Sequence, residues 1–267
     1  MSVRPIRKGY VDIPEGQVHY HEAGSEEPCV VLLHQTALSA KTYDPLLASG
    51  TLENRCIALD TPGFGGSFDP PGWPSLETYA DQAIAAFTRL CPSPVHLFGH
   101  HTGASLAIEI AARAPDRVAS LILAGPVFMT QAEREDFIAG YKDPITPRRG
   151  GEHLMRNWDY AASHNPDCDI AILQDAVVDL LRAWRGRPQA YMAVAHHDTE
   201  ARAKKVAAPV LLMTTPGDFF HASFDRAKAL FPGARLAQTG GDNFPAASDP
   251  EGVAAAVRAF LEALDED

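Results

Sequence analysis

The sequence predicts an α/β fold in which helices cover both faces of a mostly parallel sheet. Continuous apolar runs such as Cys29–Leu33 are typical of strands that are buried on both faces. These runs alternate with amphipathic helical stretches, a pattern that implies right-handed crossovers between parallel strands. The chain of 267 residues is long enough to bury one large core.

The first third of the chain follows this pattern after an antiparallel start. Pro14-Glu15-Gly16 is turn chemistry between two strands expected at Val3–Ile13 and Gln17–Ala23, and the next strands are Cys29–Leu33 and Arg55–Leu59. Ser75 is a capping residue for a helix over Leu76–Leu90, whose apolar side chains recur on one face.

The stretch from Val95 to Pro126 organises the rest of the chain. It predicts a buried strand, a sharp turn at Gly99-His100-His101-Thr102-Gly103, a helix and a second buried strand. The outer glycines fit a turn in which strand and helix pass so closely that a β-carbon at either end would clash. The residue in the middle of this turn is His101.

After Pro126 the alternation of strands and helices stops. Residues 127–207 contain no buried-strand run, and they predict a helical cap inserted into a core domain of residues 1–126 and 208–267. Helices are expected near Gln131–Tyr141, Gly150–Ser163, Ile170–Trp184 and Gln189–Ala195.

The core pattern then resumes with alternating strands and helices. The expected elements are a strand at Pro209–Thr215, a helix at Ser223–Phe231, a strand at Leu236–Gln238 and a closing helix at Pro250–Leu264. Asp218 lies just beyond the first of these strands.

Composition excludes several classes of function. The 23 basic and 34 acidic residues give a formal charge of −11, which disfavours nucleic acid and anionic membranes as partners. No signal peptide or membrane span is visible, so we expect a cytoplasmic protein, present as a monomer or homodimer. The four cysteines have no paired spacing, so we expect reduced thiols. We expect neither a metal site nor a cofactor.

Together these motifs resemble the α/β-hydrolase superfamily over nearly the whole chain. The matches are Asp60-x-Pro-Gly-x-Gly-x-Ser67, the turn at Gly99–Gly103, the segment Pro209–Asp218 and the Phe244-Pro245 pair with the helix that follows it. The resemblance implies an eight-stranded sheet and identifies the turn as the nucleophile elbow.

The resemblance also implies a catalytic triad, which this chain carries in altered form. The acid falls on Asp218, the base position falls on Asn243, and the nucleophile position falls on His101. Acyl-enzyme chemistry through a serine at the elbow is therefore excluded. The oxyanion hole would consist of the backbone N–H groups of Thr36 and Thr102, with Gln35 in place of the usual glycine.

A histidine at the elbow can act as a general base or as a direct nucleophile, since imidazole has an ordinary pKa of about 6.5. We expect Asp218 and Asn243 to position water or substrate. His101 and Asp218 also have structural alternatives: a packed histidine in a protein without catalysis, and a helix cap near Ser223. His100 is expected to pack beside the elbow, and His34 to brace its loop.

A substrate pocket is expected over the elbow. Gln35, His34 and His197 are candidate lining residues, together with cap aromatics that core packing explains equally well: Trp158, Tyr160, Trp184 and Tyr191. His196, His197 and His221 invite a metal interpretation, but adjacent histidines on a helix point about 100° apart.

The sequence thus predicts an enzyme that acts on a small, partly apolar ester, lactone or related carbonyl compound. A cofactor-independent lyase, in which His101 abstracts a proton, and a small-ligand binder without turnover are the alternatives. A small-molecule substrate is the expected partner in the first two cases.

Overall fold

The computed structural model describes residues 4–164 and 166–266. Its strands are β1 (Arg7–Ile13), β2 (Gly16–Ala23), β3 (Glu26–Leu33), β4 (Asn54–Leu59), β5 (Val95–His100), β6 (Val118–Ala124), β7 (Val210–Thr214) and β8 (Arg235–Gln238). They form one eight-stranded sheet in the order β1-β2-β4-β3-β5-β6-β7-β8. The pairs β1/β2 and β2/β4 are antiparallel and the other pairs are parallel, which confirms the predicted mostly parallel sheet.

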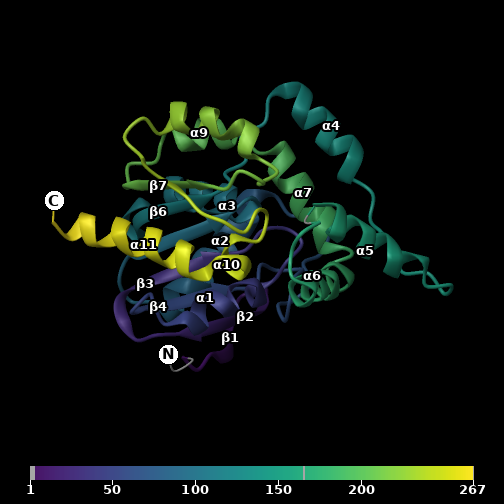
Figure 1. The fold of residues 1–267 in the computed structure, drawn as a ribbon, viewed down its shortest axis with the longest axis horizontal. Helices are drawn as coiled ribbons and strands as arrows, with labels where there is room; N and C mark the ends of the chain where they lie inside the picture. The colour runs from purple at the N-terminus through teal and green to yellow at the C-terminus, as the bar shows by residue number, and fades with distance from the viewer. Residues whose placement is uncertain (1–3, 165, 267) are drawn as a thin grey trace.

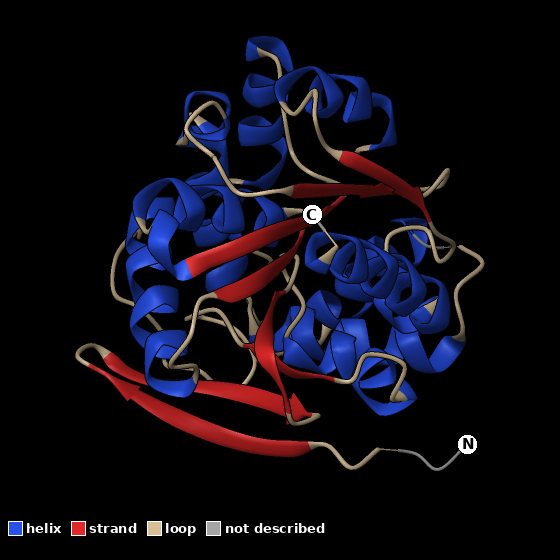
Figure 2. Cartoon of the chain, turned by 90° about the vertical axis from the view of Figure 1, so that its left-hand side faces the viewer, coloured by secondary structure: helices blue, strands red, loops and turns tan. Residues whose placement is uncertain are grey.

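The helices of the core cover both faces of this sheet (Figures 1 and 2). They are α1 (Asp44–Ser49), α2 (Leu76–Leu90), α3 (Thr102–Arg113), α9 (Phe224–Leu230), α10 (Pro245–Ser248) and α11 (Pro250–Asp265). Short 3₁₀ turns occur at η1 (Ala40–Tyr43), η2 (Pro115–Arg117) and η3 (His221–Ser223). Val3, the expected start of the first strand, lies outside the described residues.

Alternate residues of the central strands enter separate apolar clusters. On β5, Leu97 packs with side chains of α2 and α3, whereas Phe98 packs with those of α1 and α11. Val31 and Leu32 of β3 divide in the same way. This two-residue period explains why the central strands have continuous apolar sequences: both of their faces are buried.

Local signals set the ends of several elements. The Ser75 hydroxyl accepts the Thr78 N–H at the start of α2, as expected for a helix cap. Thr130 and Glu133 form a capping box at the start of α4 (Gln131–Tyr141). The cysteines carry free thiols, as expected, with Cys29, Cys56 and Cys91 buried.

The described residues between β6 and β7, where the sequence lacks buried-strand runs, form five helices. They are α4, α5 (Glu152–His164), α6 (Ile170–Arg182), α7 (Gly186–His196) and α8 (Thr199–Ala203). Figure 1 shows α4 to α7 gathered at one side of the sheet. We call α4–α8 the inserted helices. Helices α7 and α8 pack directly on α3, so the insertion is joined to the helix that follows the elbow.

Candidate active site

The sharp turn lies where the sequence predicts it, between β5 and α3. His101 has φ 48° and ψ −109°, a strained backbone conformation for a residue with a side chain. A β-carbon on Gly99 would collide with the backbone of Gly103, and one on Gly103 with the carbonyl oxygen of Leu33. Only glycines at these two positions let the strand and helix approach so closely.

The His101 ring is hydrogen-bonded to Asp218, which lies in the loop after β7. His101 Nε2 lies 2.7 Å from Asp218 Oδ2. The other carboxylate oxygen, Oδ1, accepts the Phe220 N–H at 2.6 Å. The Asp218 side chain is only 2% exposed, so the ring is held from a buried position. Asp218 therefore does not cap the helix near Ser223 but contacts the elbow residue directly.

Electrostatics favour a charged carboxylate in this pair. Burial alone would raise the pKa of Asp218. Its attraction to the imidazolium form of His101 and the hydrogen bond from that ring outweigh burial and hold the pKa well below its usual value. An ionised Asp218 can only accept a hydrogen bond, so the network assigns the proton to His101 Nε2. Among the described residues no other group hydrogen-bonds the ring, so in the neutral imidazole the free lone pair lies on Nδ1.

His100 packs behind the elbow residue, as expected. Its ring lies 4.2 Å from the His101 ring, measured between centroids, and the residue is 3% exposed. Burial, reinforced by the nearby charge of His101, lowers the pKa of His100 to about 4. Its Nε2 lies 4.0 Å from Asp218 Oδ2, which is beyond hydrogen-bond distance.

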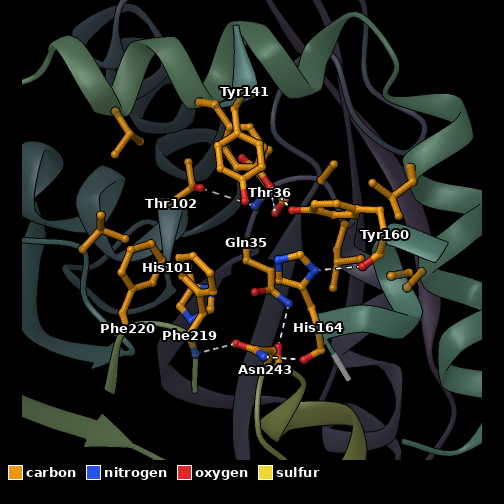
Figure 3. A pocket seen from close by; sticks show the side chains of 18 of the residues that line it. Gln35, Thr36, His101, Thr102, Tyr141, Tyr160, His164, Phe219, Phe220 and Asn243 are labelled. Atoms are coloured by element: carbon orange, nitrogen blue, oxygen red, sulfur yellow. Dashed lines mark hydrogen bonds between the residues drawn. The ribbon is translucent and has the colours of Figure 1, made fainter. Parts of the chain in front are cut away.

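Asn243 lines the pocket, but its amide is engaged in the fold. Its Oδ1 accepts the Phe219 N–H at 2.8 Å and its Nδ2 donates to the His164 carbonyl at 2.8 Å. Gln35 Nε2 donates to the Asn243 backbone carbonyl at 2.7 Å. These bonds join α5 to the loop after β7 (Figure 3). Asn243 therefore holds pocket segments together, and its amide is not directed at His101 or Asp218.

The two threonines predicted for the oxyanion hole lie together at the elbow. Thr102 is the first residue of α3, and Thr36 lies in the loop after β3. Thr36 N lies 3.4 Å from Thr102 Oγ1, a long hydrogen bond that brings the two residues side by side (Figure 3). Both line the same pocket as His101. The N–H groups in the first turn of a helix have no partner within that helix and favour negative charge.

A pocket opens over the elbow between the core and the inserted helices. Gln35 and Tyr160 line it, as the sequence predicts. The core contributes side chains that follow β3, β5 and β7, and α4 to α7 contribute the opposite wall. The lining residues not named among the candidates include Phe137, Tyr141, Ala161, His164, Leu180, Phe219 and Phe220. The sequence could have indicated Phe219 and Phe220 as lining residues, because they directly follow the predicted acid Asp218.

Three tyrosines form a connected group in this wall. Tyr160 Oη lies 3.1 Å from Tyr191 Oη, and Tyr191 Oη donates to the Thr36 carbonyl at 3.3 Å. Tyr141 packs against Tyr191 with 5.0 Å between ring centroids. The guanidinium of the buried Arg187 stacks on Tyr160 at 3.9 Å. Phenol hydroxyls and His164 are thus the polar groups of a wall that is otherwise apolar.

Four expected lining residues are absent from the pocket lining, namely His34, Trp158, Trp184 and His197. His34 braces its loop, donating from Nδ1 to the Gln35 carbonyl and accepting the Thr61 N–H at Nε2. Trp158 packs against the main apolar cluster, and Trp184 lies under the guanidinium of Arg185. Helical spacing identifies residues that share a face, but not which face borders the pocket, and this explains the errors on the two tryptophans.

His197 belongs to a separate buried cluster. Its Nε2 lies 2.9 Å from Glu109 Oε2, and the Arg202 guanidinium lies 2.9 Å from the same oxygen. His196 is exposed, and His221 hydrogen-bonds Thr214. These three histidines are therefore not gathered around one point. The potential metal ligands that do converge among the described residues are His100, His101 and Asp218, and separately Glu77, Glu109 and His197.

The fold and the elbow identify a class of protein. The sequence profile of the alpha/beta hydrolase family matches residues 30–256, so the chain belongs to this family. Its solved structural neighbours share the architecture: bromoperoxidase from Bacillus anthracis has a TM-score of 0.79 at 19% identity, covering 96% of this chain and 100% of that one. Naproxen esterase from Bacillus subtilis has a TM-score of 0.74 at 18% identity, covering 97% and 92%.

Its relatives in sequence include hydrolases, esterases and dehalogenases. Carboxylesterase YbfK from Bacillus subtilis is 27% identical over 98% of this chain and 90% of its own length. The (E)-2-((N-methylformamido)methylene)succinate hydrolase of Acinetobacter baylyi is 32% identical, but the match covers 45% of this chain and 46% of that protein. The chain thus spans less than half of that relative. No helix among the described residues is long and apolar enough to cross a membrane.

Proposed function

We propose that the protein hydrolyses a small, partly apolar ester, lactone or related carbonyl substrate, with His101 as the general base. The observation that carries this proposal is the 2.7 Å bond between His101 Nε2 and Asp218 Oδ2. Because Nε2 carries the proton, Nδ1 is the basic nitrogen. In a serine-based triad a carboxylate also holds the histidine by a hydrogen bond. Here the histidine itself occupies the elbow position that the serine has in such a triad.

The proposed reaction needs only groups that lie at the pocket. His101 Nδ1 takes a proton from a water molecule, whose oxygen attacks the substrate carbonyl carbon. The Thr102 N–H stabilises the oxyanion of the tetrahedral intermediate, joined by the Thr36 N–H as it exchanges its long hydrogen bond to Thr102 Oγ1 for the substrate. The carbon–oxygen bond to the leaving group then breaks, and the imidazolium returns its proton to the departing oxygen. The charge of Asp218 stabilises that imidazolium between the two transfers.

The pocket supports a substrate of modest size with apolar and polar parts. Phe137, Phe219 and Phe220 offer apolar contact, while Tyr160 and Tyr191 offer hydroxyl groups. Burial raises the pKa of Tyr141 to about 12 and that of Tyr160 still further, so both phenols stay protonated. The Tyr160 hydroxyl donates to Tyr191, which itself donates to Thr36, so Tyr141 is the phenol that can donate to a substrate oxygen. The esterases and hydrolases among the relatives support this substrate class by analogy.

The test compares wild type with His101→Ala and Asp218→Asn on p-nitrophenyl esters and simple lactones. We expect both variants to lose about 10²–10⁴ in kcat, the usual contribution of a positioned base. An asparagine at position 218 can donate to Nε2 and so favours the tautomer with its proton on Nδ1, which cannot act as the base. His196→Gln, at an exposed histidine, is the control and should retain full activity.

The alternatives give different results in the same experiment. A mass increment on His101 during turnover would indicate that the imidazole is a nucleophile and not a base. Cleavage of β-hydroxy carbonyl compounds in place of esters would indicate a lyase. If His101→Ala and Asp218→Asn both leave every measurable turnover unchanged, His101 is not the base and this proposal fails.

A further inference from the structure

Three potential metal ligands converge behind the elbow. One ring nitrogen of His100, one of His101 and a carboxylate oxygen of Asp218 all lie within 4.8 Å of one another. His101 Nε2 is 2.7 Å and His100 Nε2 is 4.0 Å from Asp218 Oδ2. All three residues are buried. The sequence places His100 and His101 together, but only the fold adds Asp218, which is 117 positions further along the chain.

The unpartnered nitrogen of His100 is a second and independent observation. His100 is 97% buried, as its exposed fraction is 3%, and its Nε2 has no hydrogen-bond partner among the described residues. A buried polar atom without a partner costs free energy comparable to a lost hydrogen bond. This atom faces the carboxylate that already holds His101, so a ligand between the three groups would satisfy it.

We propose that His100, His101 and Asp218 bind a divalent transition-metal ion such as Zn²⁺. Two imidazoles and one carboxylate are a common ligand set for zinc and for other first-row metals, with water in the remaining positions. Ligand bonds of about 2.0–2.2 Å place neighbouring ligand atoms about 3.3 Å apart in a tetrahedral site. His101 and Asp218 must therefore separate by roughly half an ångström and His100 must move inward by a similar amount.

The second acidic cluster does not fit a metal in the same way. Glu109 Oε2 already accepts from Arg202 at 2.9 Å and from His197 at 2.9 Å, and Arg113 lies 3.6 Å from its other oxygen. A divalent ion there would be repelled by two guanidinium groups. No lysine or arginine of the described residues forms an ion pair with Asp218, whose ion-pair partners are the two histidines.

Metal binding would prevent His101 from acting as a general base. This consequence rests on the proposed function. The ion takes the Nε2 lone pair of His101 and displaces the proton that Nε2 shares with Asp218. A neutral imidazole has one N–H, which must then lie on Nδ1. Nδ1 becomes a donor and cannot take a proton from water. Zinc is therefore an inhibitor of the His101 reaction and not a participant in it.

Binding is tested without substrate. Wild-type protein treated with a chelator is titrated with Zn²⁺ by calorimetry, and its Co²⁺ form is examined by visible and X-ray absorption spectroscopy. We expect one ion per chain with nitrogen and oxygen ligands. His100→Gln and Asp218→Asn should each weaken binding at least about tenfold. His196→Gln should bind as wild type does, because that histidine is exposed.

The activity measurement separates this inference from the proposed function. Zn²⁺ should inhibit wild type reversibly, and the ratio of activity with and without zinc should approach one in His100→Gln. Absence of stoichiometric binding, or binding that none of the three ligand variants weakens, overturns the metal site and leaves the proposed base untouched. Should variants fold poorly, the absorption spectrum of the wild-type Co²⁺ form decides: a shell without histidine nitrogen contradicts the site. If the protein binds zinc but shows no turnover, the proposed function is wrong and the metal site stands.

Discussion

At the scale of single residues, Gly125 shows how tightly the His101–Asp218 pair is enclosed. It follows β6 with φ 51°, and a β-carbon there would lie 2.6 Å from Asp218 Oδ2 and 2.7 Å from His101 Nε2. Those distances are too short for any contact with carbon. The glycine therefore creates the space in which the imidazole and the carboxylate meet.

We predict that Gly125→Ala lowers kcat by about 10²-fold, the cost of displacing a catalytic group by about an ångström. Gly140→Ala is the matched control, because nothing lies within 4 Å of a β-carbon at that position in α4. Steady-state kinetics on the best ester substrate measure both variants. Equal activity of Gly125→Ala and wild type would contradict the proposed role of the pair.

The buried His100 makes a prediction about stability against acid. Its pKa of about 4 in the folded protein is below the ordinary 6.5, so between these values the unfolded chain binds a proton that the folded protein excludes. Stability therefore falls as pH drops from 6.5 to 4, by up to about 3 kcal/mol from this residue. Urea melts across this range should show a shallower fall for His100→Gln than for His196→Gln. Parallel curves would contradict it.

Asp218 affects stability at lower pH than His100 does. Its pKa is lowered on folding, so its stabilising effect is fully present above the ordinary carboxyl pKa of about 3.9 and is lost only as pH falls below that value. The two residues are in the same cluster, yet acid affects them in sequence. His100 titrates first, in the range where the carboxylate still holds the His101 ring.

At the scale of elements, α3 connects the elbow to the inserted helices. Its N-terminus follows His101, and its Glu109 is fully buried against His197 after α7 and Arg202 of α8. This cluster fixes α7 and α8, and Tyr191 of α7 lines the pocket. The buried ion cluster thus positions part of the pocket wall relative to the elbow.

We predict that Glu109→Ala destabilises the protein by about 3 kcal/mol, since removal of one member of a buried pair leaves its partners unpaired. Glu200→Ala is the control, because its ion pair with Lys204 joins side chains that are both 62% exposed. Such a pair contributes at most about 1 kcal/mol. Chemical denaturation measures both. A loss for Glu109→Ala no larger than that for Glu200→Ala would show that the cluster does not secure the inserted helices.

Element positions followed closely from the sequence. Helix α2 begins and ends where the pattern places it, at Leu76 and Leu90, because Ser75 caps it and two prolines follow it. Helix α4 also matches its predicted bounds, Gln131–Tyr141. The strand β3 begins at Glu26, ahead of the expected Cys29, since its first residues are exposed and carry no apolar signal.

At the scale of the whole molecule, the pocket lies at the junction of core and insertion, and its size limits the substrate. We predict that kcat/KM on p-nitrophenyl esters is highest for short acyl chains and falls for palmitate, because bulky aromatic side chains line the pocket on both sides, among them Phe137, Tyr160 and Phe220. A series from acetate to palmitate measures this. Preference for the longest chain would contradict it, and a bulky residue at Ala161 should shift the optimum to shorter chains.

The division into a core of residues 1–126 and 208–267 and a cap of residues 127–207 stays a prediction, as do the cytoplasmic location and the state as a monomer or homodimer. The packing of α7 and α8 on α3 shows that the insertion has a firm attachment to the core.

The sequence by itself determined the architecture and the position of His101, because strand and helix periods, turn glycines and helix caps are local properties of the chain. Only the tertiary structure decided the partners: that Asp218 binds His101 and not Asn243, that Asn243 binds Phe219 and His164, and that His197 is committed to Glu109. These contacts join residues far apart in the chain. Their geometry depends on how strands and helices pack in space, which no local pattern encodes.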